Sequence, residues 1–338
     1  MLGHETGEGS PDGWMFMNRA VFLFPGQGSQ EPGIGKALAE IFPAAAALFE
    51  RSGTIVGREF LDTLFGAQGE ALRDTRFAQP AVFLVSMAAA EVLRSLGASP
   101  SGAAGHSLGE YSALVAAGVL TFEDGLRIVR ERARLMSECA ARSKGGMAAI
   151  IGLGLDELKT LVAETAQTCP VEIANINSPE QVVVSGGEEF VERFSAIALK
   201  TGAKRAVRLK VSGAFHSTLM SPVAEQLPRL FEQYRFSAPR VPFVSNVTGD
   251  FASEPNEIKR LLAEQVCRPV LWNTSMKRFI DAGFSPFVEV GPGRVLKGLM
   301  RRVGSPRPRV YSAGQPDAIR RTAQELLEPG RRSAALSS

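Results

Sequence analysis

A serine between two glycines, at residues 105–109, constrains the fold of this chain more than any other feature of its sequence. The spacing G-x-S-x-G is typical of a sharp turn from a strand into a helix, where glycine is the residue best tolerated. A helix-forming run follows the second glycine. The pattern therefore predicts that Ser107 is either a nucleophile held on such a turn or an ordinary residue of a glycine-rich corner.

The segments around this turn favour an α/β fold. Residues 20–24 are wholly apolar and are followed by Pro-Gly, which is the pattern of a strand buried on both faces of a parallel sheet. Residues 79–97 predict a helix, with a proline near its first position and a glycine just past its end. The Ala/Gly-rich segment before Ser107 has low strand propensity, so a strand there needs closely packed neighbours. Residues 287–300 again predict strand, glycine turn and helix.

Between these segments the pattern changes, from residue 145 to about residue 215. Strand, helix, strand, strand, helix and strand follow one another, with a turn around residues 177–179 between the central strands. This order is the split unit of a ferredoxin-like subdomain. We therefore expect a discontinuous large α/β domain with a ferredoxin-like insert. The predicted boundaries are 18–142 and 212–328 for the large domain, 143–211 for the insert, and disordered ends at 1–17 and 329–338.

Composition excludes several classes of function. The 338 residues include 45% hydrophobic and 22% charged side chains, and the net charge of +3 comes without a dense Lys/Arg block. A nucleic-acid partner is therefore not expected. No run approaches 18 uncharged apolar residues, which argues against a membrane span. The three cysteines are far apart and in no metal-binding spacing, so we expect reduced thiols, no metal site and a cytoplasmic protein.

If Ser107 is a nucleophile, it needs a base within hydrogen-bond reach, and histidine is the usual one. The chain has three histidines. His4 falls in the predicted leader, and His106 is adjacent to Ser107, where side chains on a sharp turn point apart. His216 is therefore the candidate base. The alternative is a histidine that caps a loop.

A second candidate is Arg132, in a predicted amphipathic helix. Arg127, Arg130 and Arg134 share one helical face and predict a solvated stripe. Arg132 points the opposite way, among apolar residues three and four positions away. A buried arginine keeps its charge and needs an anionic partner. That partner is either an Asp or Glu in a buried ion pair or the carboxylate of a substrate, gripped bidentately.

Five motifs of the chain resemble those of a known family. The motifs "FPGQGSQ" at residues 24–30, "GHSLGE", an arginine 25 residues after the serine, "GAFHS" and "VEVGPG" look like those of malonyl-CoA:acyl-carrier-protein transacylases. Acyltransferase domains of polyketide and fatty-acid synthases share them. The resemblance covers residues 18–303 and implies a hydrolase-like core with a parallel sheet and a ferredoxin-like insert.

The resemblance also assigns roles by position. It implies that Ser107 is the nucleophile and His216 its base. The oxyanion hole would use the backbone N–H groups of Gln27 and Leu108, since main-chain donors near a glycine-rich turn can point at a developing oxyanion. Arg132 matches the arginine that binds the malonyl carboxylate, in agreement with the helical-face argument.

Three further residues complete the implied site. The family orients its histidine with a backbone carbonyl, and the matching position is Gln265, with Asn246 in the same set of base-orienting residues. Phe215 immediately precedes the base, where malonyl-specific relatives carry a bulky aromatic side chain. The Ala/Gly-rich strand before the nucleophile departs from relatives, in which it is often more β-branched.

The resemblance implies a two-step transfer of malonyl from malonyl-CoA to the phosphopantetheine thiol of an acyl carrier protein. It implies fatty-acid or polyketide synthesis as the setting, no cofactor, and a monomeric protein.

Other functions stay open at this stage. An acyl hydrolase, or thioesterase, on the same fold would share the serine and histidine but would not need Arg132. A trans-acting acyltransferase could use another extender unit. An α/β-hydrolase esterase would place an acidic residue between serine and histidine, although "FPGQGSQ" and the insert fit it poorly. A non-catalytic docking protein would not need an intact nucleophile and base.

Overall fold

The structure is a computed structural model that describes residues 19–66, 71–304 and 307–328. The predicted leader and the tail lie outside the described residues. The strands are β1 (Val21–Phe24), β2 (Gly102–Gly105), β3 (Gly145–Ile151), β4 (Val171–Ser178), β5 (Gln181–Gly187), β6 (Arg205–Arg208), β7 (Phe287–Val290) and β8 (Val310–Ala313).

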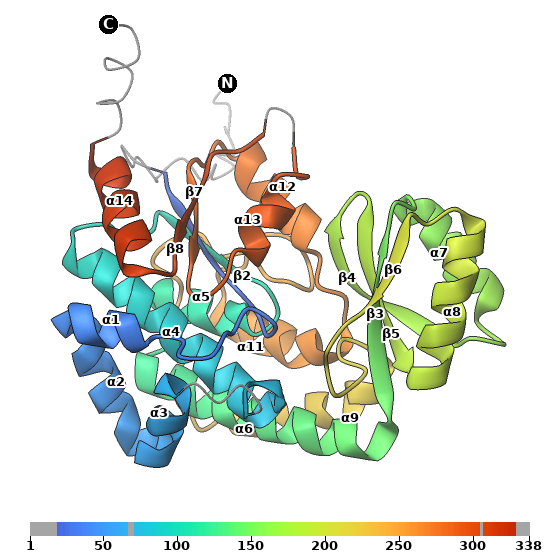
Figure 1. Cartoon of the computed structure of the whole chain (residues 1–338), viewed down its shortest axis with the longest axis horizontal. Coiled ribbons are helices and arrows are strands. Elements are labelled where there is room, and N and C mark those ends of the chain that lie inside the picture. Colours follow the sequence, from blue (N-terminus) through green and yellow to red (C-terminus); the bar gives the residue numbers. More distant parts are fainter. Residues whose placement is uncertain (1–18, 67–70, 305–306, 329–338) are drawn as a thin grey trace, which may run out of the picture.

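The helices of the large body surround its sheet (Figure 1). Before the insert these are α1 (Lys36–Ile41), α2 (Pro43–Val56), α3 (Arg58–Phe65), η1 (Ala71–Arg73), α4 (Thr75–Ser95), α5 (Gly109–Ala116) and α6 (Phe122–Ser143). After it come η2 (Thr218–Met220), α9 (Ser221–Ala224), α10 (Leu227–Phe231), α11 (Pro255–Glu264), η3 (Gln265–Cys267), α12 (Trp272–Asp281), α13 (Val295–Met300) and α14 (Pro316–Leu327).

The first sheet is parallel, with the strand order β2-β1-β7-β8. β1 lies between β2 and β7, with Val21 opposite Gly102 on one side and Phe287 on the other. All four β1 residues are buried, which confirms the strand predicted from the apolar run at 20–24. The carboxyl ends of β1 and β2 therefore lie side by side, and the two turns that follow them build the site.

The second sheet is antiparallel, with the order β4-β5-β3-β6. Helices α7 (Leu155–Thr165) and α8 (Glu188–Thr201) pack on it, away from the large body (Figure 1). This confirms the predicted β-α-β-β-α-β order and its ferredoxin-like arrangement. The last strand ends at Arg208, where the chain leaves the sheet and runs toward residues 211–216, beside the site.

The long helix α4 corrects one prediction. We expected it to begin near Pro80, but it begins at Thr75, and Pro80 lies inside it. The Asp74 side chain accepts a hydrogen bond from the Arg76 N–H at 2.9 Å and so caps the helix five residues earlier. α4 has the length and apolar composition of a membrane-crossing helix, but 78% of its most apolar window is buried inside the protein. It is the core helix against which α2 and α6 pack.

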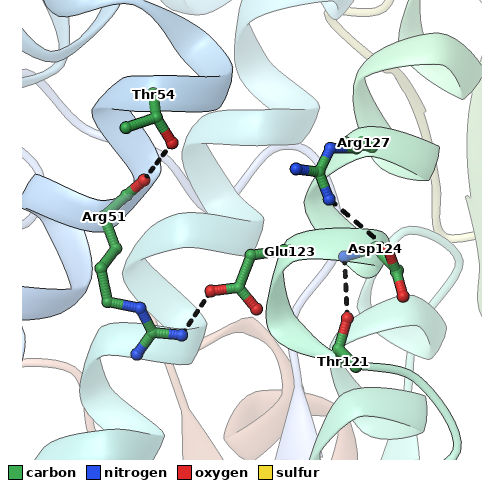
Figure 2. Close-up of polar contacts among 6 residues, drawn as sticks. All are labelled: Arg51, Thr54, Thr121, Glu123, Asp124 and Arg127. Carbon is green, nitrogen blue, oxygen red and sulfur yellow. Dashed lines mark hydrogen bonds and ion pairs between the residues drawn. The ribbon is translucent and has the colours of Figure 1, made fainter.

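Helix α6, which carries Arg132, is fixed at its N-terminus. The Thr121 hydroxyl accepts a hydrogen bond from the Asp124 N–H at 3.1 Å, and Arg51 of α2 pairs with Glu123 (Figure 2). Such a cap stabilises a helix by ~1 kcal/mol, whereas an exposed ion pair contributes ~0–1 kcal/mol. Arg127 is exposed on the outer face of α6, as the sequence pattern predicts for the stripe to which it belongs.

Candidate active site

The turn between β2 and α5 is tight because two glycines allow three backbone segments to meet. A Cβ atom at Gly105 would lie 1.9 Å from the carbonyl carbon of Gly109, and one at Gly109 would lie 2.0 Å from the carbonyl oxygen of Phe24. Between them Ser107 has a φ of 50°, in the left-handed region that side chains other than glycine adopt at a cost. The spacing G-x-S-x-G thus lifts the serine off the sheet edge.

Asn246 holds this turn from outside. Its Oδ1 accepts a hydrogen bond from the Ser107 N–H at 2.7 Å, and its Nδ2 donates to the Gly105 carbonyl at 2.7 Å. We expected Asn246 to orient the base, but its recorded hydrogen bonds include none to His216. Because the amide spans the nucleophile turn, Asn246 stabilises the strained backbone of Ser107 instead.

Ser107 and His216 are 109 residues apart in sequence and meet at this turn. The Ser107 Oγ lies 2.7 Å from the His216 Nε2. On the other side of the ring, the Nδ1 lies 2.8 Å from the Gln265 carbonyl oxygen and 3.2 Å from that of Arg268. Two carbonyls can only accept, so the Nδ1 carries the proton and the Nε2 accepts the serine proton. Gln265 therefore orients the ring through its backbone, at the position implied by the resemblance.

The surroundings of His216 keep the imidazole neutral. Burial is the larger cause and the nearby Arg132 charge the second, and together they lower the pKa of His216 to about 3. The two carbonyl contacts raise it in part. The imidazole is therefore neutral at physiological pH, and its Nε2 has a lone pair that can accept the serine proton.

Arg132 is buried on the inner face of α6, next to this pair. Its guanidinium donates to the Gln79 Oε1 at 2.6 Å, to the Gln265 Oε1 at 2.9 Å and to the Ser107 Oγ at 3.4 Å. These partners are all uncharged, so the described part of the chain gives Arg132 no ion pair. The Tyr111 ring lies 5.3 Å from the guanidinium carbon. The sequence left two partners open for Arg132, a buried Asp or Glu and a substrate carboxylate. This arrangement favours the substrate carboxylate.

A cavity of about 270 Å³ opens over Ser107, and six of the site residues predicted from the sequence line it. The lining includes Ser107, His216, Arg132, Gln27, Leu108 and Phe215. The backbone N–H groups of Gln27 and Leu108 donate no hydrogen bond to any described residue. Both groups are therefore available to a developing oxyanion at the mouth of the turn.

Sequence reasoning missed several polar residues of the site. Gln79, from α4, holds Arg132, and His106 bonds to Asn177 of the insert at 2.9 Å between Nε2 and Oδ1. Glu110 lies buried directly behind the nucleophile turn. A charged residue within the apolar run that opens α5 is the sequence signal that could have identified Glu110. Gln79, His106 and Asn177 carry no comparable signal, because their partners are remote in sequence.

Among the described residues, no group of three or more His, Cys, Asp or Glu side chains is arranged to hold a metal ion. The arrangement that is present combines an activated hydroxyl, free backbone donors and an unpaired cation. It can form an ester with an acyl group that carries a carboxylate.

Comparisons with known proteins support this chemistry. The family model of the acyl transferase domain matches residues 21–326. The malonyl CoA-acyl carrier protein transacylase of Bacillus subtilis is 41% identical over 313 residues, covering 92% of this chain and 98% of the relative. The crystal structure of the acyl-carrier-protein S-malonyltransferase of Bartonella henselae has a TM-score of 0.87 at 37% identity, with 92% and 100% of the chains covered. A malonyl-transacylase in complex with a type II PKS acyl-carrier protein has a TM-score of 0.87 at 35% identity, with 91% and 100% covered.

Proposed function

This chain belongs to the acyl transferase domain family, and on that premise we propose that it transfers malonyl groups from malonyl-CoA to an acyl carrier protein. The transfer supplies fatty-acid or polyketide synthesis. It is an acyl-carrier-protein S-malonyltransferase reaction that proceeds through a malonyl ester of Ser107.

In the first half-reaction, His216 removes the proton of Ser107 as the oxygen attacks the thioester carbonyl of malonyl-CoA. The carbonyl oxygen becomes an oxyanion that the N–H groups of Gln27 and Leu108 bind. The tetrahedral intermediate then breaks its C–S bond. Coenzyme A leaves as a thiol after His216 returns the proton to its sulfur, and malonyl-Ser107 remains.

In the second half-reaction, the phosphopantetheine thiol of the carrier protein takes the place of coenzyme A. His216 accepts its proton, and the sulfur attacks the ester carbonyl. The C–O bond to Ser107 then breaks, and the serine oxygen takes the proton from His216. The free enzyme is restored and the carrier protein leaves as its malonyl thioester. No cofactor and no metal takes part in either step.

Two residues would set the choice of acyl group. Arg132 would bind the malonyl carboxylate, because its charge lies beside Ser107 and no described residue supplies it with an anionic partner. Phe215 lines the same cavity and is buried there. Its ring would exclude an α-methyl group and so disfavour methylmalonyl-CoA.

The observation that carries the proposal is the Ser107–His216 pair at 2.7 Å, beside an arginine that has no carboxylate partner in the part of the chain that the structure describes. The test is intact-mass analysis after mixing the protein with malonyl-CoA. We expect one malonyl adduct on Ser107 that carrier protein discharges faster than water does. S107A should form no adduct. An adduct discharged at the same rate with and without carrier protein would instead identify an acyl hydrolase.

We further propose that the enzyme acts as a monomer in the cytoplasm, apart from membranes and nucleic acid. All the residues of the proposed mechanism come from one chain. Cys139, Cys169 and Cys267 are free thiols, as a reducing compartment would keep them. Size-exclusion chromatography with light scattering tests the oligomeric state.

A further inference from the structure

Glu110 is a buried carboxylate that the proposed mechanism does not use. It lies in the first turn of α5 and is 1% exposed. Its Oε1 accepts a hydrogen bond from the Asn246 backbone N–H at 3.1 Å, and its Oε2 accepts one from the Gln265 Nε2 at 2.5 Å. A buried carboxylate is costly to keep, so its neighbours show what it positions.

The side-chain amide of Gln265 connects Glu110 with Arg132. Its Nε2 donates both to Glu110 and to the Ser107 carbonyl at 2.8 Å, and its Oε1 accepts from Arg132 at 2.9 Å. The Ser107 carbonyl can only accept a hydrogen bond, and so can Glu110 when it is ionised. The guanidinium of Arg132 can only donate. One orientation of the amide satisfies all three contacts, and Glu110 helps to impose it.

This arrangement also explains how Arg132 keeps its charge while its guanidinium stays available to a substrate carboxylate. Burial lowers the pKa of Arg132, and the neighbouring Tyr111 together with the Glu110 carboxylate, which lies one amide away, opposes that effect. In the same way, Arg132 and the hydrogen bonds from Gln265 and Asn246 oppose the burial that raises the pKa of Glu110 to about 7. A direct ion pair would compensate Arg132 more fully but would occupy the donors that a substrate carboxylate needs.

We propose that Glu110 is a positioning residue for substrate selection: it fixes the Gln265 amide so that the oxygen faces Arg132 and aligns the guanidinium for an acyl carboxylate. This inference rests on the proposed function. Glu110 touches neither the acyl group nor the reacting atoms, and it acts through Gln265.

The variant E110Q separates this role from a merely structural one. The backbone donor of Asn246 would hold the new amide oxygen, so the new amide nitrogen would face the Gln265 Nε2. Two donors would then meet, and rotation of the Gln265 amide would turn its nitrogen toward Arg132. We expect the ratio of kcat/KM for Ser107 acylation by malonyl-CoA to that by acetyl-CoA to fall about tenfold or more at pH 8.5, where Glu110 is ionised in the wild type.

The matched control is E289Q. Glu289 is another fully buried carboxylate, but it accepts hydrogen bonds from the backbone N–H groups of Leu296 and Lys297, each at 2.9 Å. E289Q should lose stability and keep the wild-type substrate ratio. If folded E110Q also keeps that ratio within about twofold, Glu110 is structural and the proposal is overturned.

A double-mutant cycle tests whether Glu110 acts through Gln265. Q265M removes the amide at similar length, and we expect it to lower the substrate ratio by itself. E110Q added to Q265M should then change the ratio no further, because the amide that Glu110 orients is absent. Independent, multiplicative losses in the two variants would overturn the assigned route.

A neutron structure of the deuterated wild-type protein at pH 8.5 avoids any variant that fails to fold. We expect deuterium on the Gln265 Nε2 directed at an ionised Glu110. The reverse orientation, with the Gln265 oxygen facing a protonated Glu110, would overturn the proposal. This result is independent of the proposed function, which fails separately if malonyl-CoA does not acylate the wild type.

Discussion

Replacement of Arg132 by alanine should impair the use of malonyl-CoA and spare acetyl-CoA. In the structure Arg132 is 1% exposed, and its guanidinium lies 3.4 Å from the Ser107 Oγ and has no ion-pair partner among the described residues. A malonyl ester on Ser107 would therefore supply its first anionic contact. Acetyl-CoA has no carboxylate, so its acylation does not depend on that contact.

The magnitude follows from the kind of bond that is lost. A hydrogen bond to a charged group contributes about 1.5–3 kcal/mol, which corresponds to roughly 10- to 150-fold in kcat/KM. The bond is bidentate in the arrangement we propose, which favours the upper part of that range. The assay is the initial rate of Ser107 acylation by each thioester, followed by intact mass or by release of coenzyme A.

Packing must be separated from charge in this experiment. Arg132→Ala opens a cavity beside Gln79 and Gln265, which would slow both substrates alike. Arg132→Met fills most of that space without a charge and should show the same selective loss of malonyl-CoA use. Equal losses for the two substrates in both variants would refute the reasoning, because Arg132 would then have a structural role.

Other variants test the remaining parts of the account. His216→Gln should gain stability relative to the wild type by up to about 1.4 kcal/mol per pH unit as the pH falls below 6.5, measured by urea unfolding. The unfolded wild type binds a proton on His216 as the pH falls below about 6.5. The folded wild type does so only near pH 3, because burial lowers the pKa of His216 to about 3. A constant difference between pH 7 and pH 4 would contradict this. Gly109→Ala should destabilise the protein by more than ~3 kcal/mol because its Cβ would meet the Phe24 oxygen at 2.0 Å. Gly298→Ala, in α13, should leave the free energy of unfolding unchanged or raise it, because a Cβ added there would have no neighbouring atom within 4 Å outside its own helix backbone. Thr121→Ala should cost ~1 kcal/mol of unfolding free energy without a change in kcat/KM, since it removes the α6 cap. Phe215→Ser should raise the use of methylmalonyl-CoA relative to malonyl-CoA by about 10-fold or more, and an unchanged ratio would place selectivity elsewhere.

The sequence by itself determined the features that depend on local pattern. The apolar run of β1 predicted a doubly buried strand, and the order of successive segments predicted the β-α-β-β-α-β insert. Helical periodicity alone placed Arg132 on the inner face of α6, where the structure has it. Each of these inferences uses residues within one or two turns of each other, so the chain encodes them locally.

Tertiary structure decided the contacts that join remote segments. The start of α4 is a local feature instead, because Asp74 caps the helix by accepting a hydrogen bond from the Arg76 N–H, and this cap is a stronger signal than Pro80. Asn246 turned out to hold the nucleophile turn, and Glu110 to meet Gln265 across 155 residues. A buried polar group can be satisfied by many donors and acceptors along a chain, and only the packed fold brings one of them within hydrogen-bond distance.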